Sequence, residues 1–274
     1  EETDLIEERG ARNIAFQNDQ LFTCGILVEG FETVVVEHFA LDTVTGTYGL
    51  TTGTAIQPLS AALATCIGRV TSYRAPHLIV ADPCWSTTSG EQVSGLIKTF
   101  RVDTAMDTIL VDAQDNTYGG YWPFGEGVSL GMNFGRALAL KGDTLFVGFG
   151  PALSGADAHV EVFRKNPIAG WDRFKQIHIP EGWGGPTIGD LGQAIVPVGN
   201  ELIIGTDQGV AFYQEVDTSW VLQHFEALGG AATSISVDGD LMAVAVPEVG
   251  EVYIYERTAT GIAEARSVQA LRLA

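Results

Sequence analysis

The sequence predicts an all-β protein, a β-propeller of four-stranded antiparallel blades with five blades visible in the chain. Three observations predict this fold. The chain of 274 residues contains 33 glycines and 46% hydrophobic residues, which is typical of a folded protein with many tight turns. Short apolar runs of period two are bounded by Gly, Asp and Asn, as strands are. The same strand–turn–strand unit occurs five times, as in folds whose blades surround an axis.

The five units align on a leucine that follows each turn. The stretch NFGRALALKGDTLFVGFG at 133–150 shows the unit plainly, with two apolar runs joined by Lys-Gly-Asp. A Gly-Asp or Gly-Asn pair supplies the left-handed backbone that a two-residue hairpin requires. We therefore expect one domain over 1–274, with leucine anchors at Leu21, Leu78, Leu145, Leu202 and Leu241 and blades at approximately 10–60, 62–118, 130–180, 190–227 and 231–274.

The last three units are regular enough for individual strands to be predicted, and the first two are more divergent. A β-sandwich also contains short strands at this spacing. It does not explain why the unit of glycine, turn and apolar strand recurs in register. The strands expected in blades 3, 4 and 5 are 136–140, 145–149, 159–164 and 171–178, then 193–198, 202–206, 210–215 and 220–225, then 233–237, 241–246, 251–256 and 265–271.

The third unit resembles an FG-GAP repeat, the blade unit of integrin α-chain propellers and of many secreted surface proteins. Phe134-Gly135 matches the Phe-Gly element, and Gly148-Phe149-Gly150-Pro151 stands where Gly-Ala-Pro is usual. Further copies follow, so the resemblance covers 130–256. It implies an extracellular or cell-surface propeller that acts in adhesion. The family's Asp-x-Asp-x-Asp-Gly calcium loop is not present in that form.

Two loops contain oxygen ligands at a looser spacing. Asp112, Asp115 and Asn116 lie in VDAQDNTYGG, and Asp238 and Asp240 lie in VDGDL. Ca²⁺ takes carboxylate and carbonyl oxygens, so these loops are calcium candidates. Asp and Asn are equally the residues that form turns through local hydrogen bonds, and this interpretation is favoured. We expect no cofactor, with calcium as the alternative.

The charge balance excludes one class of partner. The chain has 34 acidic and 15 basic residues, a formal charge of −19. Nucleic-acid binding requires a basic stripe, and the sequence contains no run of Lys or Arg. The acidity favours solubility, with divalent cations or basic partners as the alternatives. No apolar run approaches the roughly 20 residues that span a bilayer, so we expect no membrane-spanning helix.

Large aromatic residues gather in the loops of one predicted face. The loop that enters a blade's first strand and the loop between its second and third strands must share one face, which we call the loop face. Such loops carry recognition in many proteins, and aromatic residues contribute large contact areas. The same side chains can instead cap the core, so both interpretations stay open for the candidate binding residues Trp85, Tyr121, Trp122, Phe124 and Trp183. Trp171 and Trp220 begin outer strands and are expected to be packing residues.

Two of the three cysteines are placed to pair. With a turn at Ala75-Pro76, antiparallel pairing brings Cys66 and Cys84 opposite each other at the open end of a hairpin, within reach of a disulfide. A bridge there would indicate an oxidising, extracellular compartment. Cys24 is expected to be a buried apolar residue.

No catalytic motif is found. The five histidines show no spacing that suggests zinc, and each is expected at the surface or at a strand edge. No Gly-x-Ser-x-Gly nucleophile elbow is present. The sequence therefore predicts no enzyme but an extracellular or cell-surface module for binding, adhesion or assembly through its loop face.

The partner expected for this module is a protein or glycan at the cell surface, or copies of the chain itself, and not nucleic acid. One alternative function is a hydrolase or lyase with a cryptic site in the central funnel. Another is a structural subunit of a filament or coat. A convergent cluster of Asp, Glu or His at the axis of the loop face would favour the enzyme. Whether five blades close the ring stays open.

Overall fold

Five antiparallel sheets follow one another along the chain and form a five-bladed β-propeller, as the sequence predicts. Within the described residues every regular element is a strand, and no helix there is long and apolar enough to cross a membrane. The computed structural model describes residues 11–17, 19–29, 31–56, 70–83, 86–88, 91–93, 95–103, 105, 108–111, 117–119, 134–150, 158–166, 170–180, 188–256 and 266–272.

The first two blades contain the irregular part of the fold. Blade 1 has the order β1-β2-β3-β4, and blade 2 has the order β5-β6-β9-β10, with β11 added on β9. A separate hairpin, β7-β8, lies between the second and third strands of blade 2. The bounds are β1 Ala11–Gln17, β2 Gln20–Glu29, β3 Phe31–Asp42, β4 Thr47–Ile56, β5 Val70–Arg74, β6 His77–Asp82, β7 Ser86–Thr88, β8 Glu91–Val93, β9 Leu96–Asp103, β10 Thr108–Val111 and β11 Thr117–Gly119.

The last three blades are simple four-stranded meanders in which each strand pairs with the next. Their strands lie within two residues of the expected ranges at every end. The bounds are β12 Leu138–Lys141, β13 Thr144–Phe149, β14 His159–Asn166 and β15 Gly170–Ile177 in blade 3, β16 Leu191–Val198, β17 Glu201–Thr206, β18 Gly209–Val216 and β19 Ser219–Ala227 in blade 4, and β20 Ser234–Asp238, β21 Leu241–Val246, β22 Glu251–Glu256 and β23 Arg266–Arg272 in blade 5.

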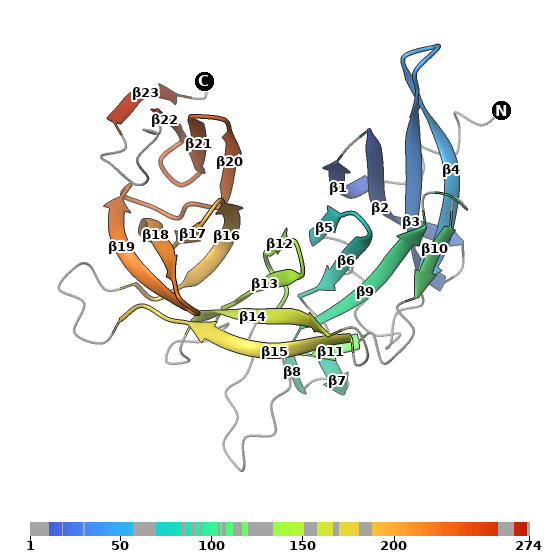
Figure 1. The fold of residues 1–274 in the computed structure, drawn as a ribbon, viewed down its shortest axis with the longest axis horizontal. Helices are drawn as coiled ribbons and strands as arrows, with labels where there is room; N and C mark the ends of the chain where they lie inside the picture. The colour runs from blue at the N-terminus through green and yellow to red at the C-terminus, as the bar shows by residue number, and fades with distance from the viewer. Residues whose placement is uncertain are drawn as a thin grey trace.

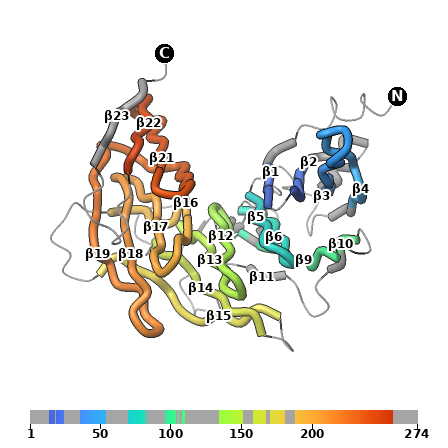
Figure 2. The backbone as a smooth tube through the Cα atoms, turned by 45° about the horizontal axis from the view of Figure 1, so that its top comes forward, coloured from blue at the N-terminus to red at the C-terminus, as the bar shows by residue number. Residues whose placement is uncertain are grey.

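The blades are arranged as an arc with blades 1 and 5 at its two ends (Figure 1). The first strand of each blade lies toward the middle of the arc, and the fourth strand lies on its outer side. The tilted view in Figure 2 shows the same succession of blades from β1 to β23. Consecutive first strands contact one another from β1 through β5, β12 and β16 to β20, so these strands line the inner side of the arc, next to the axis.

The hairpins at the inner strands are set by two-residue turns. Gly142, Gly199 and Gly239 have φ of 55°, 56° and 56° and begin the turns of blades 3, 4 and 5. This left-handed backbone is the conformation predicted from the Gly-Asp and Gly-Asn pairs. Asp240 is therefore a turn residue, the interpretation favoured from the sequence over a role as a calcium ligand.

The core consists of four hydrophobic clusters, one at each junction between consecutive blades. At each junction the later blade contributes two residues that pair with each other across its second and third strands. We call these two residues a Leu–aromatic pair, with Met in place of Leu in blade 5. The pairs are Leu78–Phe100, Leu145–Phe163, Leu202–Tyr213 and Met242–Tyr255, all at most 4% exposed. In blade 5 the register places Met242 at this position. The anchor expected at Leu241 is therefore wrong. Leu241 lies one residue before Met242 on the same strand, so its side chain lies on the other face of the sheet.

Small residues on the facing sheet let consecutive inner strands approach closely. A Cβ at Gly148 would lie 2.2 Å from the carbonyl oxygen of Gly192, and a Cβ at Gly205 would lie 2.1 Å from that of Ala232. Neither distance leaves room for a side chain. The equivalent positions of the other blades are also small, namely Cys24, Ala81 and Ala245.

We expect Gly205→Ala to lower the free energy of unfolding by about 1–3 kcal/mol, because the added methyl overpacks a junction that is set by two backbones. Urea unfolding measures this change. The control is Gly49→Ala, where a Cβ meets nothing within 4 Å, and we expect no loss of stability there. Equal stability of Gly205→Ala and the unmodified chain would show that the junction between blades 4 and 5 is not packed as described.

Candidate functional site

Four polar side chains meet at the loop-face ends of blades 3 and 4, and we call them the axial cluster. Arg136 precedes β12, Asp190 and Gln193 lie at the start of β16, and Asp207 follows β17. Because β12 and β16 are inner strands, the cluster lies beside the axis of the propeller (Figure 1). It joins three segments that are distant in the sequence.

An ion pair between Arg136 and Asp190 is the centre of the cluster. Arg136 Nη1 donates to Asp190 Oδ2 at 2.6 Å, and Arg136 Nε donates to the carbonyl oxygen of Gly192 at 3.1 Å. The two side chains are 15% and 23% exposed. A Cβ at Gly150 would lie 2.1 Å from Arg136 Nη1, so the glycine leaves the space that the guanidinium fills.

Asp207 holds the backbone that carries Asp190. Its carboxylate accepts the amide hydrogens of Gly189 at 3.1 Å and Asp190 at 3.3 Å, and its own amide donates to the Asp190 carbonyl at 3.2 Å. Gln193 Nε2 donates to Asp190 Oδ2 at 3.3 Å. The position of the Asp190 carboxylate is therefore fixed from both its backbone and its side chain.

One donor and one acceptor of the ion pair lack a partner. Within the part of the chain that the structure describes, Arg136 Nη2 and Asp190 Oδ1 are buried and form no hydrogen bond. Buried polar atoms are nearly always hydrogen-bonded, so each such atom needs an explanation. A water or a ligand with one acceptor and one donor would satisfy both atoms.

Blade 5 repeats the backbone contact of this cluster but not its ion pair. Glu248 follows β21 and accepts the amide hydrogen of Ala231 at 3.3 Å. In the same way, Asp207 accepts the amide hydrogens of Gly189 and Asp190 before β16. The position equivalent to Arg136 is Gln193 in blade 4 and Thr233 in blade 5. Among the three regular blades, Arg136 is thus the one cation at this position.

A second polar group lies between the two outer strands of blade 3. Glu161 is 1% exposed, and it forms an ion pair with Arg173 (Nε–Oε2 2.8 Å) and accepts from Gln176 Nε2 at 3.0 Å. His159 Nε2 lies 3.1 Å from Glu161 Oε1, and the rings of His159 and His178 have centroids 5.0 Å apart. Oε1 lies within hydrogen-bond distance of His159 and Gln176, and Oε2 forms the ion pair with Arg173 but no hydrogen bond among the described residues. Because all of these partners belong to blade 3 and the group lies away from the inner strands, we assign it a structural role.

Tyr213 connects this region to the axial cluster. Its hydroxyl donates to the His178 carbonyl oxygen at 3.1 Å, where the chain leaves blade 3 on its way to Asp190. The side chain is buried, and burial raises the pKa of the Tyr213 hydroxyl above its ordinary value near 10. The phenol is therefore a neutral donor throughout the physiological range.

The aromatic residues predicted as a binding surface all fall outside the described residues, so this stays a prediction for Trp85, Tyr121, Trp122, Phe124 and Trp183. The two tryptophans expected in the core are described. Trp171 is 2% exposed, and Trp220 packs against Phe146 with ring centroids 5.6 Å apart. Their packing role is confirmed.

The metal and disulfide candidates are likewise untested. Asp112, Asp115 and Asn116 lie outside the described residues, as do Cys66 and Cys84. Across the described ranges, no group of three or more His, Cys, Asp or Glu side chains is arranged to hold a metal ion. Cys24 is buried in blade 1, as expected.

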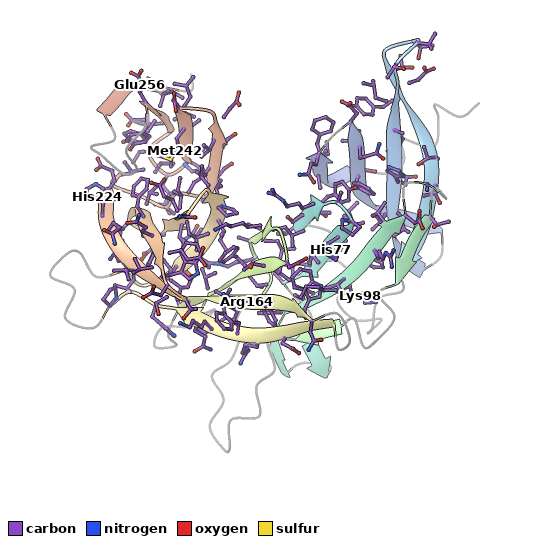
Figure 3. The ribbon with its side chains drawn as sticks, viewed as in Figure 1. His77, Lys98, Arg164, His224, Met242 and Glu256 are labelled. Carbon is purple, nitrogen blue, oxygen red and sulfur yellow. The ribbon has the colours of Figure 1, made fainter. Side chains whose placement is uncertain are left out.

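The prediction that every histidine lies at the surface or at a strand edge is wrong for three of the five. His38, His77 and His159 are 1%, 9% and 6% exposed. His77 packs on the ring of Trp171 in the next blade, with centroids 5.2 Å apart, whereas His224 lies on the outer strand β19 (Figure 3). An imidazole fills the space between blades as an aromatic side chain does.

The fold is similar to that of three solved lactonase structures. One is a candidate 6-phosphogluconolactonase of Bacteroides fragilis, with a TM-score of 0.51, 14% identity and coverage of 93% of this chain and 82% of that chain. The periplasmic gluconolactonase of Pseudomonas aeruginosa has values of 0.50, 12%, 95% and 85%. A candidate 6-phosphogluconolactonase of Bacteroides uniformis has values of 0.50, 10%, 93% and 82%. No family model and no curated protein matches the sequence.

This likeness establishes the propeller fold and corrects the expected family. The similar structures are lactonase-type propellers, so the FG-GAP resemblance is wrong, and the adhesion function and the absence of enzymatic activity that accompanied it are wrong as well. The misleading residues have a packing role. Phe134 is 0% exposed and contacts Phe149 and Phe163, and Gly148 permits the close approach of the next blade. Propeller geometry alone selects such residues.

The residues of the axial cluster were not among the sequence candidates. Arg136 and Asp190 are separated by 54 residues, so no local motif connects them. A signal does exist in the aligned repeats. Arg136 follows a small residue, and the next two blades have Gln193 and Thr233 at the equivalent position. A cation at one repeat position where the neighbouring repeats have neutral residues is the signal that could have singled out Arg136.

We expect Tyr213→Phe to lower the free energy of unfolding at pH 7 by about 1 kcal/mol, because the His178 carbonyl loses its donor. Since the folded state holds the phenolic proton more tightly, the unmodified chain loses stability as the pH rises above about 10, by about 1.4 kcal/mol per pH unit from this residue. Tyr213→Phe removes this part of the slope. Urea unfolding between pH 7 and pH 11 measures both effects.

The control for this experiment is Tyr48→Phe, since Tyr48 is 39% exposed on β4. We expect it to leave the stability at pH 7 unchanged. A Tyr213→Phe variant with the same stability at pH 7 and the same alkaline slope as the unmodified chain would contradict the role given to this hydroxyl.

Proposed function

We propose that this chain is a hydrolase that opens lactones, with the axial cluster as its active site. The observation that carries the proposal is the Arg136–Asp190 pair beside the axis, in which one guanidinium nitrogen and one carboxylate oxygen lack a partner. A convergent polar cluster at this position distinguishes an enzyme from a flat binding face. The fold likeness to three lactonases supports the same reaction class.

Arg136 is the electrophilic group of the proposed reaction. Its Nη1 and Nε are held by Asp190 and the Gly192 carbonyl, so the direction of Nη2 is fixed. Nη2 donates to the carbonyl oxygen of the lactone and stabilises the negative charge that develops on that oxygen in the tetrahedral intermediate. Donors that are oriented before the reaction lower the barrier most, since they need no reorganisation.

Asp190 is the general base and then the general acid. Its Oδ1 takes a proton from a water molecule while the water oxygen bonds to the carbonyl carbon. The intermediate then collapses, the ring C–O bond breaks, and the protonated carboxyl returns its proton to the departing alkoxide. The net change is one water added and one hydroxy acid formed, with Asp190 restored.

The charge at the site favours an uncharged lactone. The described loop-face segments of blades 3 to 5 contain three carboxylates and one cation, which are Asp190, Asp207, Glu248 and Arg136. The cation is already paired with Asp190. A phosphorylated lactone would bring two further negative charges to a site of net negative charge, so we expect it to be the poorer substrate.

The test is a proton-release assay with D-glucono-δ-lactone, corrected for spontaneous hydrolysis. We expect the unmodified chain to catalyse ring opening, and Asp190→Asn and Arg136→Gln each to lower kcat/KM by about 10²–10⁴-fold. The matched control is Lys141→Gln, which breaks an ion pair with Glu215 (3.0 Å) at the opposite ends of the same two blades. This variant should keep full kcat/KM.

Two results would overturn the proposal. One is the absence of lactone hydrolysis by a chain that urea unfolds in a cooperative transition and that is therefore folded. The other is an equal loss of activity in Lys141→Gln and Asp190→Asn, since it would trace the loss to the junction between the blades and not to the axial cluster. A higher kcat/KM for the phosphorylated lactone would refute the assignment of an uncharged substrate.

The proposed location is outside the cytoplasm. It is supported by the periplasmic neighbour and by the predicted pairing of Cys66 with Cys84. Alkylation of the denatured chain, followed by mass spectrometry, tests the pairing. We expect both cysteines to react only after reduction, whereas alkylation of both without reduction would contradict the bridge and remove its support for the location.

A further inference from the structure

Blade 1 exposes the side of its sheet that every other blade buries. Leu21 and Phe39 face each other on β2 and β3 in the register of the Leu–aromatic pairs. In blades 2 to 5 these pairs are covered by the preceding blade. In blade 1 no hydrophobic cluster of the described residues covers this pair, and Leu21 and Phe39 are only partly buried.

The exposed row continues across the whole sheet of blade 1. Phe16 on β1 pairs with Leu21, and Leu50 on β4 pairs with Phe39, so one apolar row crosses four strands. Phe16 is 57% exposed and Leu50 is 59% exposed. The Tyr48 ring packs edge-on against Phe16 with centroids 6.1 Å apart, which widens the patch. A contiguous apolar patch of this kind marks an interaction site.

Blade 5 exposes the complementary side. In blades 1 to 4 the side that faces the next blade contains a large apolar residue and, two positions later, a small one. Ala243 and Ala245 hold these positions in blade 5, where no hydrophobic cluster of the described residues includes them, and neither is fully buried. Leu241 on the same side is 56% exposed, and Ser234 and Ser236 are exposed on the inner strand.

We propose that the blade 5 face of one copy of this chain packs on the blade 1 face of a second copy. The four internal junctions show what covers a Leu–aromatic pair, namely the opposite side of another blade, and blade 5 carries the one such side that is uncovered in the described residues. Within one copy the two faces lie at opposite ends of the arc (Figure 1), and no hydrophobic cluster of the described residues joins them.

The two faces also fit in size. Phe16 is a large residue at the blade 1 face, and Ala243 is smaller than the Phe or Ile found at its position in blades 1 to 4. The contact is heterologous, because two different faces meet. After the first contact the pair of copies retains one free blade 1 face and one free blade 5 face, on different copies. With a charge of −19 on each copy, repulsion opposes association, and added salt should strengthen it.

The test is size-exclusion chromatography with light scattering over a range of protein and salt concentrations. We expect the unmodified chain to form a concentration-dependent dimer or larger species, strengthened by salt. Phe16→Glu and Leu241→Glu should each be monomeric, because each variant loses one of the two faces. An equimolar mixture of the two variants should form a heterodimer, since one intact face of each kind remains in it.

The matched control is Val216→Glu, an exposed apolar residue (46%) at the turn between β18 and β19, which should associate as the unmodified chain does. Recovery of a dimer in the mixture also shows that both variants are folded. A monomeric unmodified chain in high salt would overturn the proposal. A Leu241→Glu variant that still dimerises while Phe16→Glu does not would also overturn it, in favour of a symmetric contact between two blade 1 faces.

Discussion

The packing of each Leu–aromatic pair on the small-residue side of the preceding blade is the interaction on which the rest of the structure depends. A single four-stranded sheet cannot bury both of its sides, so its stability comes from its neighbours. Small residues such as Gly148 and Gly205 let the inner strands approach until backbone meets backbone. That approach also builds the candidate site, because the Gly192 carbonyl that lies against Gly148 is the group that accepts from Arg136 Nε.

Much of this fold follows from local physical rules and could therefore be predicted. The turns at Gly142 and Gly199 require left-handed backbone, and the flanking apolar residues alternate, so the sequence predicts the strand ends of blades 3 and 4 to within two residues. The prediction failed where two registers looked alike. Leu241 and Met242 are both apolar, and only packing against blade 4 shows that Met242 is the buried one. The β7-β8 hairpin has strands of three residues, too short for a periodic signal.

The candidate site could not be predicted in the same way. Arg136 and Asp190 meet because consecutive blades bring their inner strands together, and their separation of 54 residues carries no periodic signal. The family resemblance failed for a related reason. Phe134 packs at the junction of blades 2 and 3, and the Gly135 amide donates to the Gly148 carbonyl within blade 3. Such residues serve the fold, so similar residues recur in propellers of unrelated function. Packing residues report the fold, whereas function depends on the few polar residues that packing leaves unexplained.

Two ion pairs between described residues join blades 3 and 4, and their difference separates a structural role from a chemical one. Lys141–Glu215 lies at the turn ends of the inner strands, is 30% and 29% exposed, and places its ammonium 5.4 Å from the centre of the Trp220 ring. Neither partner has a buried atom left without a hydrogen bond in the described part of the chain. Arg136–Asp190 is less exposed and has one such atom on each partner. Burying a charge without full compensation costs stability, so a pair kept in that state is better explained by what it binds than by what it stabilises.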